Sequence, residues 1–275
     1  MNSRIPIRFD SGIPEVRRSA FSGFPGPFSV RGRVEPAMEA SPEARRSRAV
    51  FLCSMGAIAL FLGFVPVLLG HVSGALAQWP PWLGILIRTV LLQIAYFCAV
   101  LLPSAKICPE VPLAEQLDLL PPRNAWRTFG LVSCGVLFLY PLLGTVTFLT
   151  GKILELLRIP AEPQMLALLL RNGDPASILV IAATGILLAP AGEELVFRHA
   201  VFNHFRRFAS PFAAACVSGF LFAAVHFNVL NFPALFLLAL FLQFVCCRTG
   251  SLLCAIYAHA LYNALSVCLL LCFRS

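Results

Sequence analysis

The chain has 275 residues, of which 59% are apolar and only 12% are charged, and its formal net charge at pH 7 is +8. A soluble domain carries about 25% charged residues, so this composition cannot supply a normal water-facing surface and excludes a soluble enzyme. It indicates an integral, multi-pass membrane protein.

The charged residues gather near the amino terminus. Residues 1–48 hold nine arginines and five acidic residues, which are 14 of the 34 charged residues in the chain. This segment is rich in Arg, Pro, Ser and Gly and lacks apolar periodicity, so we expect a disordered basic arm. Translation from Met38 is an alternative and would shorten the arm. Residues 49–275 are expected to form the membrane-embedded domain.

Long apolar stretches follow the arm, and about 20 apolar residues are needed for a helix to cross a bilayer. Residues 152–170 instead mix charged residues with leucines, so we expect them to lie along the membrane surface. We predict an all-α, polytopic membrane helix bundle of about seven transmembrane helices, with six to eight as the range. The expected spans are 49–70, 82–103, 129–150, 176–207, 211–227, 232–247 and 251–272.

The loops suggest an orientation in the membrane. Three arginines (Arg45, Arg46 and Arg48) precede the first span, whereas the next loop, 71–81, has no Lys or Arg. Basic loops are retained on the cytosolic side, so we predict a cytosolic amino terminus. The basic excess also favours contact with anionic membrane lipid. Because no basic patch is interleaved with aromatic residues outside the spans, we expect no nucleic-acid partner.

Six polar residues interrupt the apolar spans of the carboxy-terminal half. Burying an ionisable side chain in a membrane costs free energy, so each such residue is a candidate functional residue. Glu193 and His226 lie 33 residues apart, with a break near 209–211 midway between them. If the two flanking helices form an antiparallel hairpin, both side chains lie at a similar depth in the membrane. The six residues are Glu193, Glu194, Arg198, His226, His259 and Asn263.

Helical spacing separates the two glutamates. Glu194 and Arg198 are four residues apart, share a helix face and can form an ion pair. Glu193 points about 100° away from Glu194, so it is expected to be the carboxylate that is free for chemistry. His259 and Asn263 share a face in the same way.

This set of side chains suits amide hydrolysis without a covalent intermediate. A partly desolvated carboxylate can act as a general base toward water. A histidine beside it can hold the water, while a second histidine and an amide stabilise an oxyanion. Two histidines and a carboxylate could also hold Zn²⁺. However, the chain has no HExxH motif, so a divalent metal such as zinc and a metal-free site both stay open.

At these residues the chain resembles the CAAX prenyl protease type II and bacteriocin-processing (CPBP) family of intramembrane peptidases, commonly called metallopeptidases. The family signature is EExxxR, FxxxH and HxxxN on successive membrane helices, and the resemblance covers about 180–267. The matching motifs are Glu193-Glu194-x-x-x-Arg198, Phe222-x-x-x-His226 and His259-x-x-x-Asn263.

The resemblance implies a role for each residue. Glu193 and His226 would activate the water, and His259 and Asn263 would stabilise the oxyanion. The supporting residues would be Glu194, Arg198 and Phe222, the last of which shapes the pocket. The implied activity is endopeptidase cleavage of membrane-associated protein substrates, including prenylated CAAX-type proteins, and we expect a bacterial cell membrane.

Two other function classes fit the same polar residues. A proton-coupled transporter would use them as an ion relay, although the sequence shows no clear internal repeat of the kind that transporters contain. A non-catalytic membrane partner, such as a bacteriocin-immunity protein, would use them to bind a peptide without cutting it. The sequence leaves the substrate and the oligomeric state open.

Overall fold

A computed structural model describes residues 51–52, 55–56, 79–107, 109, 112–161 and 173–273. Within these ranges the chain forms helices and turns and no strand. Five helices are long and apolar enough to cross a membrane, and a sixth, shorter apolar helix accompanies them. The predicted all-α membrane bundle is therefore confirmed. The predicted arm at 1–48 and most of the first span at 49–70 lie outside the described residues.

The helices begin and end at recognisable sequence signals. Asp174 accepts hydrogen bonds from the first turn of its helix, and Ser210 does the same before Pro211. Gly250, at φ 63°, ends another helix in the left-handed conformation that glycine adopts without steric cost. The described elements are α2 (Pro81–Ile107), α3 (Leu113–Gln116), α4 (Ala125–Leu156), α6 (Pro175–Ala183), η1 (Thr184–Leu188), α7 (Ala189–Glu194), η2 (Leu195–Val201), α8 (Phe202–Phe205), α9 (Pro211–Ala224), α10 (Phe232–Thr249) and α11 (Leu252–Cys272).

Two helix boundaries differ from those predicted. The surface segment expected at 152–170 does not begin at residue 152, because α4 continues through Leu156. Lys152 and Glu155 form an exposed ion pair one turn apart, which lets charged residues extend the apolar helix. The fifth predicted span, 211–227, is also too long, since α9 ends at Ala224 and a turn with Phe227 at φ 49° follows.

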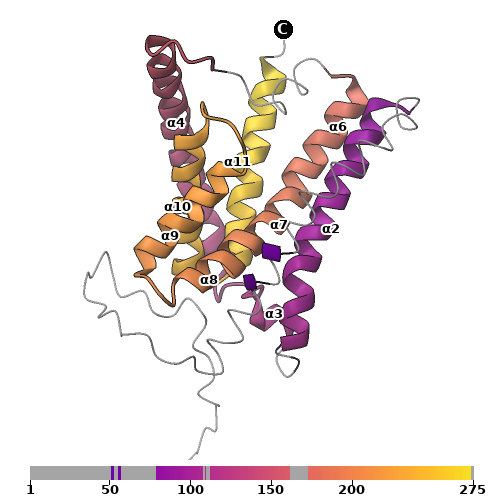
Figure 1. Cartoon of the computed structure of the whole chain (residues 1–275), viewed down its shortest axis with the longest axis vertical. Helices are drawn as coiled ribbons and strands as arrows, with labels where there is room; N and C mark the ends of the chain where they lie inside the picture. The colour runs from indigo at the N-terminus through magenta and orange to yellow at the C-terminus, as the bar shows by residue number, and fades with distance from the viewer. Residues whose placement is uncertain are drawn as a thin grey trace, which may run out of the picture.

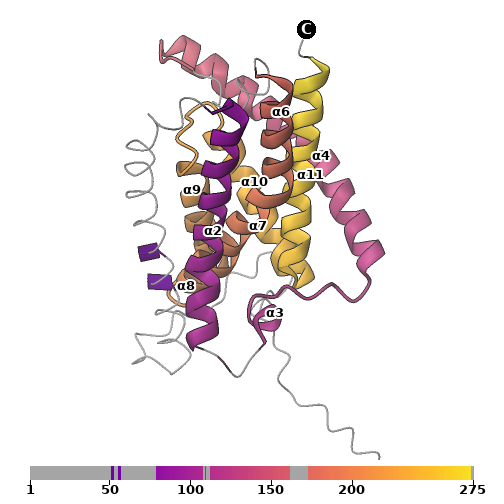
Figure 2. The ribbon, with the colours of Figure 1, turned by 90° about the vertical axis from the view of Figure 1, so that its right-hand side faces the viewer.

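The helices form two groups that meet at α11. Helix α2 packs along α6, α7 and η2, while α10 packs against α9, α4 and α11. Figure 1 shows α2 and α6 side by side, with α11 between this pair and α4, and Figure 2 shows the same bundle from the side. Segments α6 to α8 run as one apolar helix from residue 175 to 205. That helix and α9 form the predicted hairpin, which brings Glu193 and His226 to the same cavity.

A buried acid lies at the end of the bundle where α10 leads into α11. The carbonyl of Asp118 accepts a hydrogen bond from the Leu252 amide at 2.8 Å, which ties the loop before α4 to the start of α11. Its carboxyl is buried, and Oδ2 has no hydrogen-bond partner among the described residues. Burial raises the pKa of Asp118 to about 7, although the charge of Arg206 acts in the opposite direction.

This raised pKa predicts a pH-dependent stability. The native state holds the proton more tightly than the unfolded chain, so the stabilising effect is complete at low pH and is lost as the pH rises toward 7. Asp118→Asn should remove this dependence and raise the free energy of unfolding above pH 7 by about 2 kcal/mol. Asparagine also tolerates the φ of 52° at this position. Thermal unfolding in detergent at pH 5 and pH 8 measures the effect. Parallel pH curves for parent and variant would contradict it.

Candidate active site

The helix that carries both glutamates is interrupted by two π-helical segments, η1 before them and η2 after them. In η1 the Ala189 amide bonds the Thr184 carbonyl five residues earlier. The next residue, Pro190, has no N–H, so the carbonyl of Gly185 loses the donor that this spacing would supply. The Asn263 side chain fills the gap, because its Nδ2 donates to the Gly185 carbonyl at 2.8 Å. The proline thus creates the acceptor that holds Asn263 in place.

Glu194 and Arg198 form a fully buried ion pair, as their spacing predicted. Both side chains are 0% exposed, and Arg198 Nε lies 2.9 Å from Glu194 Oε2. Arg198 Nη2 donates to Glu194 Oε1 at 3.4 Å. The guanidinium also lies 5.0 Å from the centre of the Phe222 ring, in a cation–π contact. Phe222 is itself fully buried. None of these three residues lines the cavity, so they support the site from within the packed interior.

His259 connects the two glutamates. Its Nδ1 lies 2.9 Å from Glu194 Oε1, and its Nε2 lies 3.9 Å from Glu193 Oε2. An ionised carboxylate only accepts hydrogen bonds, so Nδ1 donates to Glu194 and this bond fixes the ring. Glu193 is 20% exposed, whereas Glu194 has no exposed surface. The two carboxylates therefore differ as expected: Glu194 is buried between Arg198 and His259, whereas Glu193 is partly exposed and lines the cavity.

His226 follows α9 by two residues, in the turn rather than within the helix as predicted. Its Nδ1 lies 2.7 Å from the Phe222 carbonyl oxygen. A carbonyl can only accept, so Nδ1 carries the proton and Nε2 of the neutral ring is free to act as a base. Ser218 Oγ donates to the Phe197 carbonyl at 2.7 Å, which holds α9 against η2 and fixes the position from which His226 projects.

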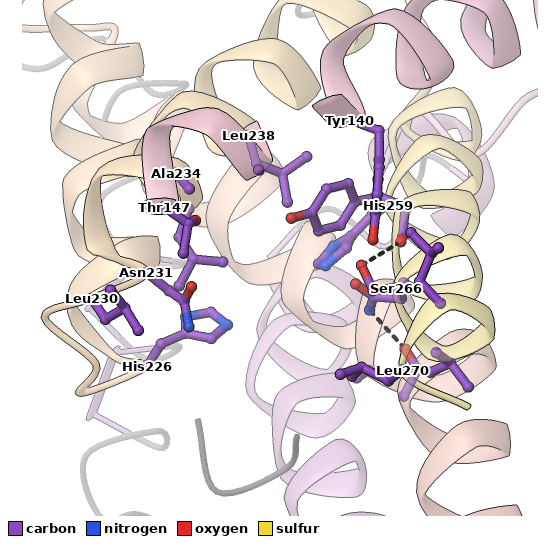
Figure 3. Close-up of a pocket in the computed structure, with 18 of the residues that line it drawn as sticks. Tyr140, Thr147, His226, Leu230, Asn231, Ala234, Leu238, His259, Ser266 and Leu270 are labelled. Carbon is purple, nitrogen blue, oxygen red and sulfur yellow. Dashed lines mark hydrogen bonds between the residues drawn. The ribbon is translucent and has the colours of Figure 1, made fainter. Parts of the chain in front are cut away.

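Glu193, His226, His259 and Asn263 all line one cavity of about 770 Å³. Figure 3 shows His226 beside Asn231 on one side of this cavity and His259 near Tyr140 and Ser266 on the other. The remaining walls come from α4, α10 and the carboxy-terminal half of α11 and are mostly apolar. The cavity thus has a small group of polar residues and apolar sides, which is the usual form of a site that binds an organic ligand.

The residues of this cavity do not form a ready metal site. Among the described residues, no three side chains of the His, Cys, Asp and Glu types gather closely enough to hold a metal ion. His259 Nδ1 is taken by Glu194, and His226 Nδ1 is taken by a carbonyl. The zinc ligand set considered from the sequence, two histidines and a carboxylate, is therefore not gathered around one point among the described residues.

The sequence analysis missed two residues of α2 that pack behind Glu193. Gln93 and Tyr96 are 3% and 8% exposed, and Gln93 Oε1 has no hydrogen-bond partner among the described residues. The Tyr96 hydroxyl lies within electrostatic reach of Glu193. Gln93 and Tyr96 lie three residues apart and so share one helix face, a signal that was visible inside the second predicted span.

Gly192 allows this close contact between α2 and α7. A Cβ atom at residue 192 would lie 2.1 Å from Gln93 Oε1 and 3.2 Å from Tyr96 Cβ. We therefore expect Gly192→Ala to lower the free energy of unfolding by about 1–3 kcal/mol, measured by thermal unfolding in detergent. Gly84→Ala is the control: Gly84 lies on the neighbouring helix α2, where a Cβ meets no described residue within 4 Å.

A second variant separates the clash from a general intolerance of alanine. Gln93→Ala removes the closest atom, so the double variant Gly192→Ala/Gln93→Ala should recover part of the lost stability relative to the sum of the single effects. The prediction fails if Gly192→Ala unfolds at the same temperature as Gly84→Ala.

The part of the chain that carries these residues also matches a known protein family. Residues 175–265 match the family described as type II CAAX prenyl endopeptidase Rce1-like, and they include Glu193, Glu194, Arg198, His226, His259 and Asn263. This region of the chain is similar to that family. The resemblance stated from the three motifs is thereby confirmed, and the matched residues include the four polar residues Glu193, His226, His259 and Asn263 that line the cavity.

One relative from Escherichia coli, named only as an uncharacterized 24.3 kDa protein, is 37% identical over 117 residues. The aligned part is 41% of this chain and 52% of the relative, so the chain spans about half the length of this curated relative. No solved structure matches the chain. The family match and the five apolar helices together identify an integral membrane protein with an Rce1-like region.

Proposed function

We propose that this protein is an intramembrane endopeptidase that hydrolyses peptide bonds of membrane-associated protein substrates. The observation that carries the proposal is the convergence of Glu193, His226, His259 and Asn263 on one cavity inside an apolar bundle. Glu193 lies on α7, His259 and Asn263 both lie on α11, and His226 lies two residues beyond the end of α9. The family match over residues 175–265 supports the same activity.

Glu193 and His226 are proposed to activate the attacking water. Glu193 is 20% exposed, and its only ionic contact among the described residues is His259 Nε2 at 3.9 Å, so its lone pairs are available to a water in the cavity. In the neutral ring of His226 the proton is on Nδ1, which donates to the Phe222 carbonyl. Nε2 then carries no proton and can act as a base. As Glu193 takes a proton from water, the oxygen attacks the substrate carbonyl carbon and the carbonyl π pair moves onto oxygen. The proton is then delivered to the leaving amine as the C–N bond breaks.

His259 and Asn263 are proposed to stabilise the oxyanion that forms. With Nδ1 bonded to Glu194, the proposed role requires that His259 also carry a proton on Nε2 and donate it toward the cavity. The Asn263 amide uses one N–H on Gly185 and keeps the second for the substrate. Donors held in place before reaction stabilise a developing negative charge without reorganising.

The cavity walls favour an apolar chain next to the cleaved bond. Leucine and valine side chains of α10 and α11 line the cavity away from the glutamate, including Leu238, Val267 and Leu270. We propose that substrates enter from the membrane with an apolar segment or a lipid modification against these walls. Prenylated CAAX-type proteins are one such class.

A direct test uses the purified protein in lipid vesicles with a fluorogenic lipidated peptide. Cleavage confirmed by product mass would support the proposal, and a chelator arm should leave the rate unchanged because the proposed steps use side chains alone. The opposing outcome is ion or proton flux across the vesicle membrane with no peptide product, which would indicate a transporter instead.

A further inference from the structure

A second cavity, of about 550 Å³, lies between the start of α4 and the end of α10, and it shares no lining residue with the site around Glu193. Two arginines, Arg123 and Arg248, line it together with the polar residues Asn124, Thr128 and Thr249. None of its lining residues is acidic. The cavity therefore presents a concentrated positive charge without an internal counter-charge.

Both arginines are available to a ligand. Each is exposed, and neither forms an ion pair with a carboxylate of the described residues. The Arg248 guanidinium lies 6.0 Å from the centre of the Phe244 ring, which also lines the cavity and holds the side chain over it. At the start of α4, Asn124 makes no side-chain capping bond. The first backbone N–H groups of this 32-residue helix add donors beside the arginines.

The other half of the cavity is apolar and continues along the membrane-spanning part of the two helices. Leu131 of α4 and Phe244 of α10 are 72% and 56% exposed, although each stands in an apolar span. Gly135 lets the Phe241 ring pack close to α4, since a Cβ there would approach that ring to 3.1 Å. The result is an apolar surface that leads away from the charged end.

The charged half lies where a lipid headgroup would be. Ser251 Oγ donates to the Leu120 carbonyl at 2.7 Å, which joins the loop before α4 to the turn between α10 and α11 at one end of the bundle. Trp126, in the first turn of α4, is 94% exposed, and tryptophan is enriched at the membrane–water interface. Arginines at this level with an apolar surface below them are complementary to an anionic amphiphile.

We propose that this cavity binds an anionic phospholipid, with its phosphate between Arg123 and Arg248 and an acyl chain along Leu131 and Phe244. Basic pockets between transmembrane helices recognise anionic headgroups by this chemistry. The bound lipid would join α4 to α10. Further along, both helices also line the cavity that contains His259. This inference does not depend on the proposed peptidase activity.

The test measures lipid retained by the purified protein in a non-ionic detergent, with phosphatidylglycerol and phosphatidylcholine offered in equal amounts and counted by native mass spectrometry. The parent should retain phosphatidylglycerol in preference. Arg123→Gln and Arg248→Gln should each lower its apparent affinity about fivefold, and the double variant about 25-fold. Arg127→Gln is the matched control: it is exposed at the start of the same helix, does not line the cavity, and should bind like the parent.

Three results would overturn the proposal. The first is equal retention of both lipids by the parent, and the second is retention by the double variant equal to that of the Arg127→Gln control. The third is displacement of phosphatidylglycerol by inorganic phosphate alone, which would assign the site to a free anion. The single variants keep the test decisive if the double variant fails to fold.

Discussion

Glu193→Gln should abolish peptide cleavage, lowering kcat by about 10³-fold, with little change in stability. The amide is nearly the same size as the carboxylate but cannot take a proton from water. Stability should be retained because Glu193 is partly exposed and its only ionic contact with a described residue is the 3.9 Å approach to His259 Nε2. Substrate binding should also persist, since the apolar walls of the cavity are untouched. The measurement is kcat and KM with the fluorogenic peptide, together with thermal unfolding of the same preparations.

Glu155→Gln is the matched control for this variant. Glu155 is exposed near the end of α4, lies outside the cavity and, within the described ranges, pairs only with Lys152. Its substitution should leave the rate at the parental value, which excludes an effect of losing any glutamate charge. If Glu193→Gln and Glu155→Gln cleave equally fast, Glu193 is not the base and the proposed mechanism is wrong.

The chemistry was easier to predict from the sequence than the scaffold that holds it. Glu193 and His259 stand out because ionisable residues are rare in apolar spans, and the four-residue spacing of Glu194 and Arg198 predicts their ion pair directly. The π-helical segments were not predictable in this way. Pro190 shows from the sequence that one backbone N–H is missing. Whether the helix widens, kinks or ends there depends on which group bonds the Gly185 carbonyl that this leaves free. That group is the side chain of Asn263, which lies 78 residues after Gly185 in the chain.

The contributions of α2 and α4 were missed for a related reason. Gln93 and Tyr96 become part of the site only because α2 packs on Gly192, and Tyr140 reaches the cavity only because α4 packs on α11. In a bilayer, the helix surface that faces lipid and the helix surface that faces another helix are both apolar. Composition therefore predicts that these helices exist but not which of their faces meet.

The largest effect on stability should come from Arg198→Met, which we expect to lower the free energy of unfolding by about 3–5 kcal/mol. The substitution keeps much of the side-chain volume but leaves the Glu194 carboxylate buried without its cation. Glu194→Gln should also destabilise, since it leaves the Arg198 guanidinium uncompensated, although the amide oxygen can still accept from His259 Nδ1. Thermal unfolding in detergent measures each variant. Arg127→Met, at an exposed site, should stay within about 0.5 kcal/mol of the parent.

The double variant Glu194→Gln/Arg198→Met separates the ion pair from packing. If the cost of each single variant is mainly an unpaired buried charge, removing both charges should cost clearly less than the sum of the two, with a coupling of about 1–3 kcal/mol. Strict additivity would instead mean that the two side chains act only by filling space. Activity should not recover with stability in the double variant. The neutral amide would orient His259 but would no longer stabilise its imidazolium, which the proposed oxyanion contact requires.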